Sequence, residues 1–273
     1  MSEGENRSGI LTAILQTKAE EIQSHCAVKP LHQLKHEVEA ALPVRSFIQA
    51  LEKRIAANEP AVIAEIKKAS PSRGVICEHF DPVSIAVEYA HYGASCLSVL
   101  TDRKYFQGSL DYIQAVRDVC TLPILCKDFI IDPYQVYEAR LAGADCILLI
   151  VAVLSDPQLR ELTDLAHQLG MDILVEVHDQ HELDRALKLP VHLIGINNRN
   201  LKTFETSVST TLSLKVHVPS DRLLVTESGI HTPDQVRMLR AEGVCAFLVG
   251  EAFMKTKHPG QALQDLFFCD QHP

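Results

Sequence analysis

From about residue 61 onward, the chain repeats one pattern: a short apolar run, a turn, and then an amphipathic stretch. The apolar runs predict eight strands, at 61–67, 96–101, 123–129, 146–152, 172–178, 193–198, 222–228 and 246–250. The amphipathic stretches predict helices at 82–92, 109–119, 133–141, 157–169, 181–187, 208–216, 233–241 and 260–268. Strands that alternate with helices pair in parallel. Nearly continuous apolar strands, such as 146–151, are typical of a sheet buried on both faces.

The helix boundaries carry recognisable start and stop signals. Asp or Thr stands at a predicted N-cap before a first-turn Pro in four pairs: Asp81-Pro82, Asp132-Pro133, Asp156-Pro157 and Thr232-Pro233. Glycines suited to the left-handed position end four helices, at 93, 143, 170 and 243. Eight strand–helix units predict an α/β protein with a (β/α)8 TIM barrel. A doubly wound sheet is the alternative, but no Gly-rich dinucleotide loop follows the first strand.

The first 60 residues do not fit the repeat. Residues 10–23 and 46–56 have helical patterns, and the stretch between them contains Pro30 and Pro43. These helices could cover the bottom of the barrel or approach its mouth. No low-complexity linker separates them from the barrel. We therefore expect residues 1–273 to form a single domain, with residues 1–60 as a helical N-terminal extension.

Composition and charge exclude several classes of function. The net charge of −9 argues against general nucleic-acid binding, although local Lys and Arg clusters can still hold an anionic substrate. No apolar run approaches the roughly 20 residues of a membrane span, and the polar start has no signal-peptide core. Eight cysteines without a CxxC pair indicate reduced thiols. Together these features predict a cytoplasmic protein.

Histidines are numerous but do not complete a metal site. His32 and His36 have HxxxH spacing, which places both on one helix face, but no third ligand stands near them in sequence. No HExxH motif is present. Because two histidines alone do not make a zinc site, we expect no metal.

Charged residues gather where the predicted strands end. Glu65 and Lys67 are two apart, so they point to the same side of the first strand. Burying two charged side chains at a strand end costs free energy unless they form an ion pair or take part in binding or catalysis. Active sites of this barrel type lie at the carboxyl ends of the strands. Polar residues follow every strand except the fourth, including Asp102, Lys127, Glu176, Asn197, Arg199, Glu227 and Glu251.

Strand parity sorts the residues at two of these ends. If Lys127 points inward, Phe129 does too, and Cys126 and Asp128 point outward. This argues against Cys126 as a nucleophile and favours a buried small side chain. His178 shares parity with Glu176 but lies farther out, so it is either a proton handler or an ordinary loop histidine.

The last two strands end in sequences suited to anion binding. Ser228-Gly229-Ile230 follows the seventh strand and Gly250-Glu251 follows the eighth. Barrels often bind phosphate through backbone N–H groups of these two loops, and glycine lets the backbone approach the anion. With Lys67 across the mouth, the pattern predicts a phosphate site.

The ordered set of motifs resembles the indole-3-glycerol phosphate synthase family of tryptophan biosynthesis. The resemblance covers nearly all of the chain from about residue 44 to 268, and the first ten or so residues look like an unshared extension. The matching stretches are VIAEIKKASPS at 62–72, LTD at 100–102, FQGS at 106–109, PILCKDFI at 123–130, LVEVH at 174–178, IGINNR at 194–199, ESGI at 227–230 and FLVGE at 247–251.

The resemblance implies that 1-(2-carboxyphenylamino)-1-deoxyribulose 5-phosphate is closed to indole-3-glycerol phosphate, with loss of CO2 and water. It implies Lys127 as general acid and Glu176 as base. Lys67 would assist loss of the hydroxyl and bind phosphate. The remaining implied site residues are Glu65 as a catalytic residue; Asn197, Arg199, Glu227, Ser228, Phe106, Phe129 and Ser70 at the substrate; and backbone groups of Gly229, Gly250 and Glu251 at the phosphate.

The reaction involves no net redox change, so we expect no cofactor. The expected partners are the phosphorylated substrate and, through weak association, other enzymes of the pathway. One alternative is a phosphate-binding barrel isomerase of the same pathway, phosphoribosylanthranilate isomerase, which would need a Cys–Asp acid/base pair at strand ends. The other is a non-catalytic barrel, which the presence of Glu65, Lys67, Lys127 and Glu176 disfavours.

Overall fold

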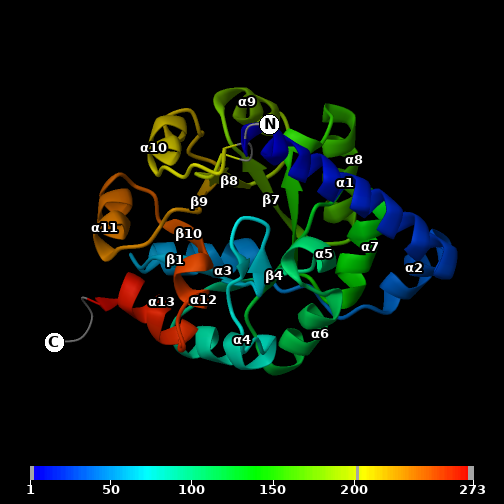
Figure 1. Ribbon diagram of the computed structural model, residues 1–273, viewed down its shortest axis with the longest axis horizontal. Coiled ribbons are helices and arrows are strands. Elements are labelled where there is room, and N and C mark those ends of the chain that lie inside the picture. Colours follow the sequence, from blue (N-terminus) through cyan, green and yellow to red (C-terminus); the bar gives the residue numbers. More distant parts are fainter. Residues whose placement is uncertain (1–2, 201–202, 270–273) are drawn as a thin grey trace.

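The computed structural model describes residues 3–200 and 203–269, and its eight long strands close into a parallel barrel (Figure 1). These strands are β1 Ala61–Ile66, β4 Cys96–Leu100, β5 Ile124–Lys127, β6 Cys146–Ile150, β7 Asp172–Val177, β8 Leu193–Asn197, β9 Leu223–Glu227 and β10 Ala246–Val249. Pairing of β1 with both β4 and β10 closes the ring. The predicted (β/α)8 TIM barrel is confirmed, and a doubly wound sheet is excluded because such a sheet stays open.

Helices cover the outside of the barrel in the predicted order (Figure 1). They are α4 Pro82–His91, α6 Leu110–Val119, α7 Pro133–Ala142, α8 Asp156–Gln168, α9 Gln180–Ala186, α10 Ser209–Lys215, α11 Pro233–Ala241 and α13 Pro259–Phe267. The predicted caps Asp81, Asp132 and Thr232 accept backbone hydrogen bonds at their helix starts. The predicted cap Asp156 is wrong: Ser155 caps α8, because it forms a reciprocal capping box with Gln158.

Several short elements lie outside the predicted pattern. They are α2 Leu31–Glu37, η1 Val38–Ala40, β2 Ala69–Ser70, β3 Gly74–Val75, α5 Arg103–Phe106, η2 Val151–Val153 and α12 Glu251–Met254. The hairpin β2–β3 follows β1, α5 follows β4, and α12 follows β10, so these three lie in loops at the carboxyl ends of strands. Their shortness explains why hydrophobic periodicity did not predict them.

Alternating side chains of the strands build two cores. The outward set packs against the helices and includes Val62, Leu97, Ile147 and Val175. The inward set fills the barrel with Ile63, Leu125, Leu148 and Leu174, and farther along the strands it continues into polar side chains. Apolar side chains therefore fill the barrel interior near the amino ends of the strands, and a polar cavity occupies it near their carboxyl ends.

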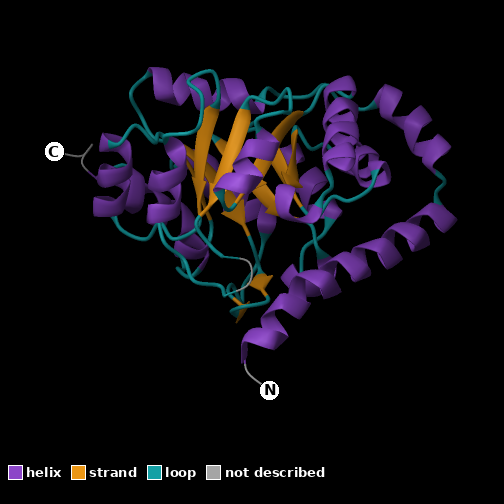
Figure 2. Cartoon of the chain, turned by 90° about the horizontal axis from the view of Figure 1, so that it is seen from above, coloured by secondary structure: helices purple, strands orange, loops and turns teal. Residues whose placement is uncertain are grey.

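The two N-terminal helices lie at opposite ends of the barrel. Helix α3 Phe47–Ala56 buries Phe47 and Leu51 completely, in one cluster with residues at the amino ends of strands such as Ala61 and Cys146. Helix α1 Glu3–Val28, longer than the predicted 10–23, crosses the end where hairpin β2–β3 lies (Figure 2). One predicted helix therefore covers the bottom and the other approaches the mouth. That residues 1–273 form one domain stays a prediction.

No helix within the described ranges 3–200 and 203–269 has the length and apolar character needed to cross a membrane.

Candidate functional site

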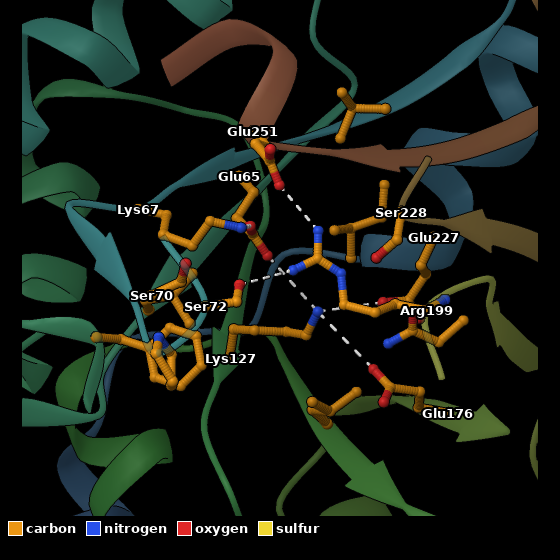
Figure 3. A pocket seen from close by; sticks show the side chains of 18 of the residues that line it. Glu65, Lys67, Ser70, Ser72, Lys127, Glu176, Arg199, Glu227, Ser228 and Glu251 are labelled. Atoms are coloured by element: carbon orange, nitrogen blue, oxygen red, sulfur yellow. Dashed lines mark hydrogen bonds and ion pairs between the residues drawn. The ribbon is translucent and has the colours of Figure 1, made fainter. Parts of the chain in front are cut away.

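A cavity of about 180 Å³ opens at the carboxyl ends of the strands. Every site residue predicted from the sequence lines it: Glu65, Lys67, Ser70, Phe106, Lys127, Phe129, Glu176, Asn197, Arg199, Glu227, Ser228, Gly229, Gly250 and Glu251. These residues come from seven different strand ends, and Figure 3 shows how their side chains converge. The roles assigned to them stay predictions.

Lys127 lies at the centre of three buried carboxylates. Its ammonium nitrogen is 3.1 Å from Glu227 Oε2, 3.6 Å from Glu65 Oε2 and 3.9 Å from Glu176 Oε2. Burial alone would lower the pKa of Lys127, but attraction to the three carboxylates outweighs it and raises that pKa. Lys127 therefore carries its proton at neutral pH and is positioned at the middle of the cavity.

The three glutamates around Lys127 differ in their proton affinity. Burial raises the pKa of Glu227 to about 7, helped by repulsion from Glu176 and Glu65 and opposed by Lys127. For Glu176, burial is outweighed by hydrogen bonds and by the charges of His178 and Lys127, which lower its pKa to about 2. Neighbouring carboxyl groups with separated pKa values are suited to different tasks in acid–base chemistry.

Lys67 and Glu65 form the ion pair that strand parity predicts. The Lys67 ammonium donates to Glu65 Oε1, and the other oxygen of Glu65 faces Lys127. Burial opposes ionisation of Glu65, but the two lysines lower its pKa. Gly250 makes this arrangement sterically feasible, because a Cβ on it would lie 2.5 Å from Glu65 Oε1. One carboxylate thus bridges the two lysines of the site.

Glu176 is held from its other side by His178. The His178 Nε2 atom lies 3.2 Å from Glu176 Oε1, and its Nδ1 lies 2.9 Å from Glu182. Burial lowers the pKa of His178, but these two carboxylates raise it to about 10. The Asn197 side chain also hydrogen-bonds to Glu176. His178 is therefore a charged partner that fixes Glu176, rather than an ordinary loop histidine.

One wall of the cavity is apolar. Phe106, at the end of α5, and Phe129, after β5, have ring centroids 6.1 Å apart. Leu148 and Ile150 of β6 line the same cavity, which explains why the fourth predicted strand ends without polar residues. Helix α1 adds Ile10, Leu11 and Ile14. Sequence reasoning missed these three, although their i, i+1, i+4 spacing marks one face of a helix.

The turns after β8 and β9 support the opposite side of the cavity. Ser228 has φ 66° and Gly229 has φ 78°, so a serine occupies the left-handed region where glycine is normally preferred. Asn198 stabilises this strained turn: its amide nitrogen donates to the Ser228 carbonyl (3.0 Å), and its oxygen accepts from Thr211 (2.8 Å). The sequence contained Asn198 in a motif but gave no signal for this supporting role.

The Glu251 side chain ties together three cations at the rim. Its oxygens lie 2.8 Å from Arg199, 2.6 Å from Lys255 and 3.3 Å from Arg73 (Arg199–Glu251 in Figure 3). Burial is outweighed by the Lys255 and Arg199 hydrogen bonds, which lower the pKa of Glu251 to about 2. The side chain is therefore engaged with cations, and its backbone N–H remains the group predicted to face an anion.

Other candidates lie away from the cavity or lack partners for a ligand. Cys126 is buried on the outer side of β5, and burial raises its pKa to about 12. This leaves no thiol for the Cys–Asp pair of an isomerase at this strand end. Within the described ranges, no three His, Cys, Asp or Glu side chains are grouped closely enough to hold a metal ion.

Comparisons with known proteins agree on one family. Residues 11–266 match the family model described as "Indole-3-glycerol phosphate synthase". A protein of that name from Polaromonas sp. (strain JS666 / ATCC BAA-500) is 58% identical over 263 residues, which is 96% of this chain and all of the relative. Another, from Polaromonas naphthalenivorans (strain CJ2), is 58% identical over 260 residues, 95% of this chain and 99% of the relative.

Solved structures with low sequence identity share the fold. A 3-hexulose-6-phosphate synthase has a TM-score of 0.61 at 14% identity, covering 76% of this chain and 97% of that one. A KGPDC from Streptococcus mutans has a TM-score of 0.59 at 11% identity, covering 76% of this chain and 95% of that one. At such identities the likeness concerns the barrel alone.

Proposed function

The chain belongs to the indole-3-glycerol phosphate synthase family, carboxy-lyases of tryptophan biosynthesis, and we propose that the cavity at its barrel mouth is where this reaction takes place. The substrate is 1-(2-carboxyphenylamino)-1-deoxyribulose 5-phosphate. It is closed to indole-3-glycerol phosphate with release of CO2 and water. Neither alternative from the sequence has support in the site: Cys126 is buried outside the cavity, and the charged set required for catalysis is complete.

The proposal assigns each part of the substrate to one side of the cavity. The phosphate lies against Lys67 and the backbone N–H groups of Gly229, Gly250 and Glu251, where the two glycines present no side chain to the anion. The aromatic ring lies beside Phe106 and Phe129. Arg199 offsets the negative charge of the substrate, while Ser70, Ser228 and Asn197 contribute hydrogen bonds.

Lys127 acts first in the proposed mechanism. The ring carbon that bears the carboxylate attacks the ketone carbon, and Lys127 donates a proton to the ketone oxygen as the new bond forms. The developing oxyanion is a stronger base than an amine, so a lysine of raised pKa is still able to donate. Loss of CO2 then returns the bonding electrons to the ring.

Dehydration completes the pyrrole ring. Glu176, ionised because of its depressed pKa, removes a proton from the ring CH2 group between the nitrogen and the carbon that bears the hydroxyl, while Lys67 protonates the departing hydroxyl. Glu65 and Glu227 keep the two lysines in position, and their contacts with Lys67 and Lys127 support this assignment. Each positioned acid or base contributes about 10²–10⁴-fold to such a reaction.

The central ammonium among three buried carboxylates is the observation that carries this proposal. A fixed cation beside the reacting oxygen stabilises charge that develops only in the transition state. The test is turnover of the carboxyphenylamino-deoxyribulose phosphate, followed by indole fluorescence and by CO2 release. We expect both signals at equal rates. Folded protein that produces neither would contradict the proposal.

We further propose that the protein acts in the cytoplasm on this phosphorylated small molecule. Support comes from eight cysteines without a CxxC pair, four of which are buried. Weak association with other enzymes of the pathway stays a prediction.

A further inference from the structure

Lys18, on helix α1, is a buried lysine far in sequence from the barrel strands. Only 4% of its surface is exposed. Its ammonium lies 2.8 Å from Glu21 on its own helix, 3.1 Å from Asp102 Oδ2 and 2.9 Å from Asp128 Oδ1. The contact with Glu21 is a hydrogen bond, and those with Asp102 and Asp128 are ion pairs. Burial disfavours its charge, but Asp128 and Asp102 outweigh burial and raise its pKa. Lys18 is therefore charged.

Asp102 connects Lys18 to one phenylalanine of the cavity. Asp102 follows β4 and is the N-cap of α5, whose last residue is Phe106. Its Oδ1 accepts from the backbone N–H groups of Tyr105 (2.7 Å) and Phe106 (3.2 Å), while its Oδ2 faces Lys18. One oxygen of this fully buried carboxylate holds the helix and the other holds the lysine.

Asp128 connects Lys18 to the other phenylalanine and to the central lysine. It is the residue directly after Lys127, and its Oδ1 accepts from the backbone N–H of Phe129 at 2.7 Å. Its second oxygen accepts from the Thr101 hydroxyl, beside Asp102. Asp128 thus fixes the backbone on which Lys127 and Phe129 stand.

The contacts of α1 separate two explanations of Lys18. The first explanation is that Lys18 only anchors α1 to the barrel. Other contacts already do this: Thr17 contacts Tyr105 (3.2 Å), His25 contacts Glu138 (2.9 Å) and Ile14 is buried. Lys18 differs because its two barrel partners each control a loop that carries a phenylalanine of the cavity. A hollow of about 140 Å³ borders Lys18, Glu21 and Asp128, so water can reach Asp128 if the ammonium is lost.

We propose that Lys18 is a positioning residue: by pairing with Asp102 and Asp128 together, it joins the loops after β4 and β5 and sets the spacing of Phe106 and Phe129. Helix α1, which lies across this end of the barrel (Figure 2), is thereby part of the substrate site through a charge as well as through its apolar face. The kinetic consequence rests on the proposed function; the coupling of the loops does not.

The test compares Lys18→Met with Lys18→Arg, and uses Glu21→Gln as the matched control. Lys18→Met keeps the length of the side chain without its charge. We expect kcat/KM to fall about 10- to 100-fold in Lys18→Met, mainly through KM, because a small displacement of distant positioning groups is enough for such a loss. Lys18→Arg restores most of it. Glu21→Gln removes the negative charge on α1 that faces Lys18 and leaves kcat/KM unchanged.

Hydrogen exchange without substrate tests the loop coupling independently of turnover. In Lys18→Met we expect faster exchange at residues 102–108 and 128–131 together. Faster exchange confined to α1, or Glu21→Gln matching Lys18→Met in kcat/KM, overturns the proposal. If wild-type protein shows no turnover, the proposed function fails, while faster exchange in both loops of Lys18→Met still supports the coupling.

If Lys18→Met does not fold, Asp102→Asn takes its place. We expect faster exchange in both loops of this variant. Faster exchange only at 102–108 overturns the proposal.

Discussion

At the scale of single residues, the buried charges of the mouth are stable only as a group. Lys127 is balanced by Glu65, Glu176 and Glu227, and Lys67 is balanced by Glu65. Removing one member of a buried set leaves its partners uncompensated, which costs more than a surface pair contributes. The same property makes each member testable by substitution.

Lys127→Ala tests the general acid. We expect kcat to fall about 10²–10⁴-fold while the substrate still binds, because the proton donor is lost but the phosphate and ring contacts remain. The pKa of Glu227 should also rise above about 7, because Lys127 lowers it in the wild-type protein. Steady-state kinetics measure the change in kcat, and a binding titration measures whether the substrate still binds. Lys68→Ala, a neighbouring lysine that does not line the cavity, is the control. Near-normal kcat in Lys127→Ala would refute the assignment.

His178 predicts how stability depends on pH. Its pKa is raised from 6.5 to about 10 in the folded state. A raised pKa contributes stability that is complete below the unfolded value and is lost as pH rises through the folded value. We therefore expect wild type to exceed His178→Gln in free energy of unfolding by the largest amount below pH 6.5. This difference should decrease as the pH rises towards 10.

Urea unfolding at pH 6, 8 and 10 measures this difference. His167→Gln, which replaces an exposed histidine of α8, serves as the control. A difference that is constant over the whole range would show that His178 is not charged by Glu176 and Glu182.

At the scale of elements, the site depends on where the strands end. Predicted strands ran one to two residues too far at their carboxyl ends, so Lys67, Phe129 and Ser228 lie in loops just beyond β1, β5 and β9. Parity still held for Lys67 and Phe129, both of which line the cavity. The strand-to-loop transition after β10 requires a glycine, because a Cβ on Gly250 would lie 2.5 Å from Glu65 Oε1.

Gly250→Ala tests this close approach. The φ of Gly250 is −134°, which alanine adopts, so the effect should be steric: the new Cβ meets Glu65 Oε1 at 2.5 Å and Glu65 Cβ at 2.8 Å. Displacing Glu65 moves both lysines, and we expect about a 100-fold loss of kcat/KM with a modest change in melting temperature. Gly9→Ala, where nothing lies within 4 Å of the added Cβ, should leave kinetics unchanged. Equal kinetics in both variants would contradict the assignment.

At the scale of the whole molecule, stability and chemistry occupy opposite ends of the barrel. Helix α3 buries Phe47 and Leu51 under the amino ends of the strands, while α1, α5 and α12 surround the mouth. This division is general for the fold, in which loops at the carboxyl ends carry function and the opposite face carries stability.

Leu51→Ala tests the division. Leu51 is fully buried, so truncation should lower the free energy of unfolding by about 2–5 kcal/mol while kcat/KM at 25 °C stays unchanged. Chemical denaturation and steady-state kinetics give the two values. The exposed Leu42 provides the control, since Leu42→Ala should alter neither. A parallel loss of kcat/KM in Leu51→Ala would show that the ends are coupled.

The sequence by itself determined the eight strand–helix units, the inward set Glu65, Lys67, Lys127 and Glu176, and the glycines of the last two loops. Period and parity are local properties, so they are readable along the chain. Only the tertiary structure decided that α1 borders the mouth, that Lys18 meets Asp102 and Asp128, and that His178 holds Glu176. The partners in these contacts depend on how the helices and strands pack together. The proton affinity of the charged groups depends on how deeply that packing buries them. Neither is encoded in residue spacing.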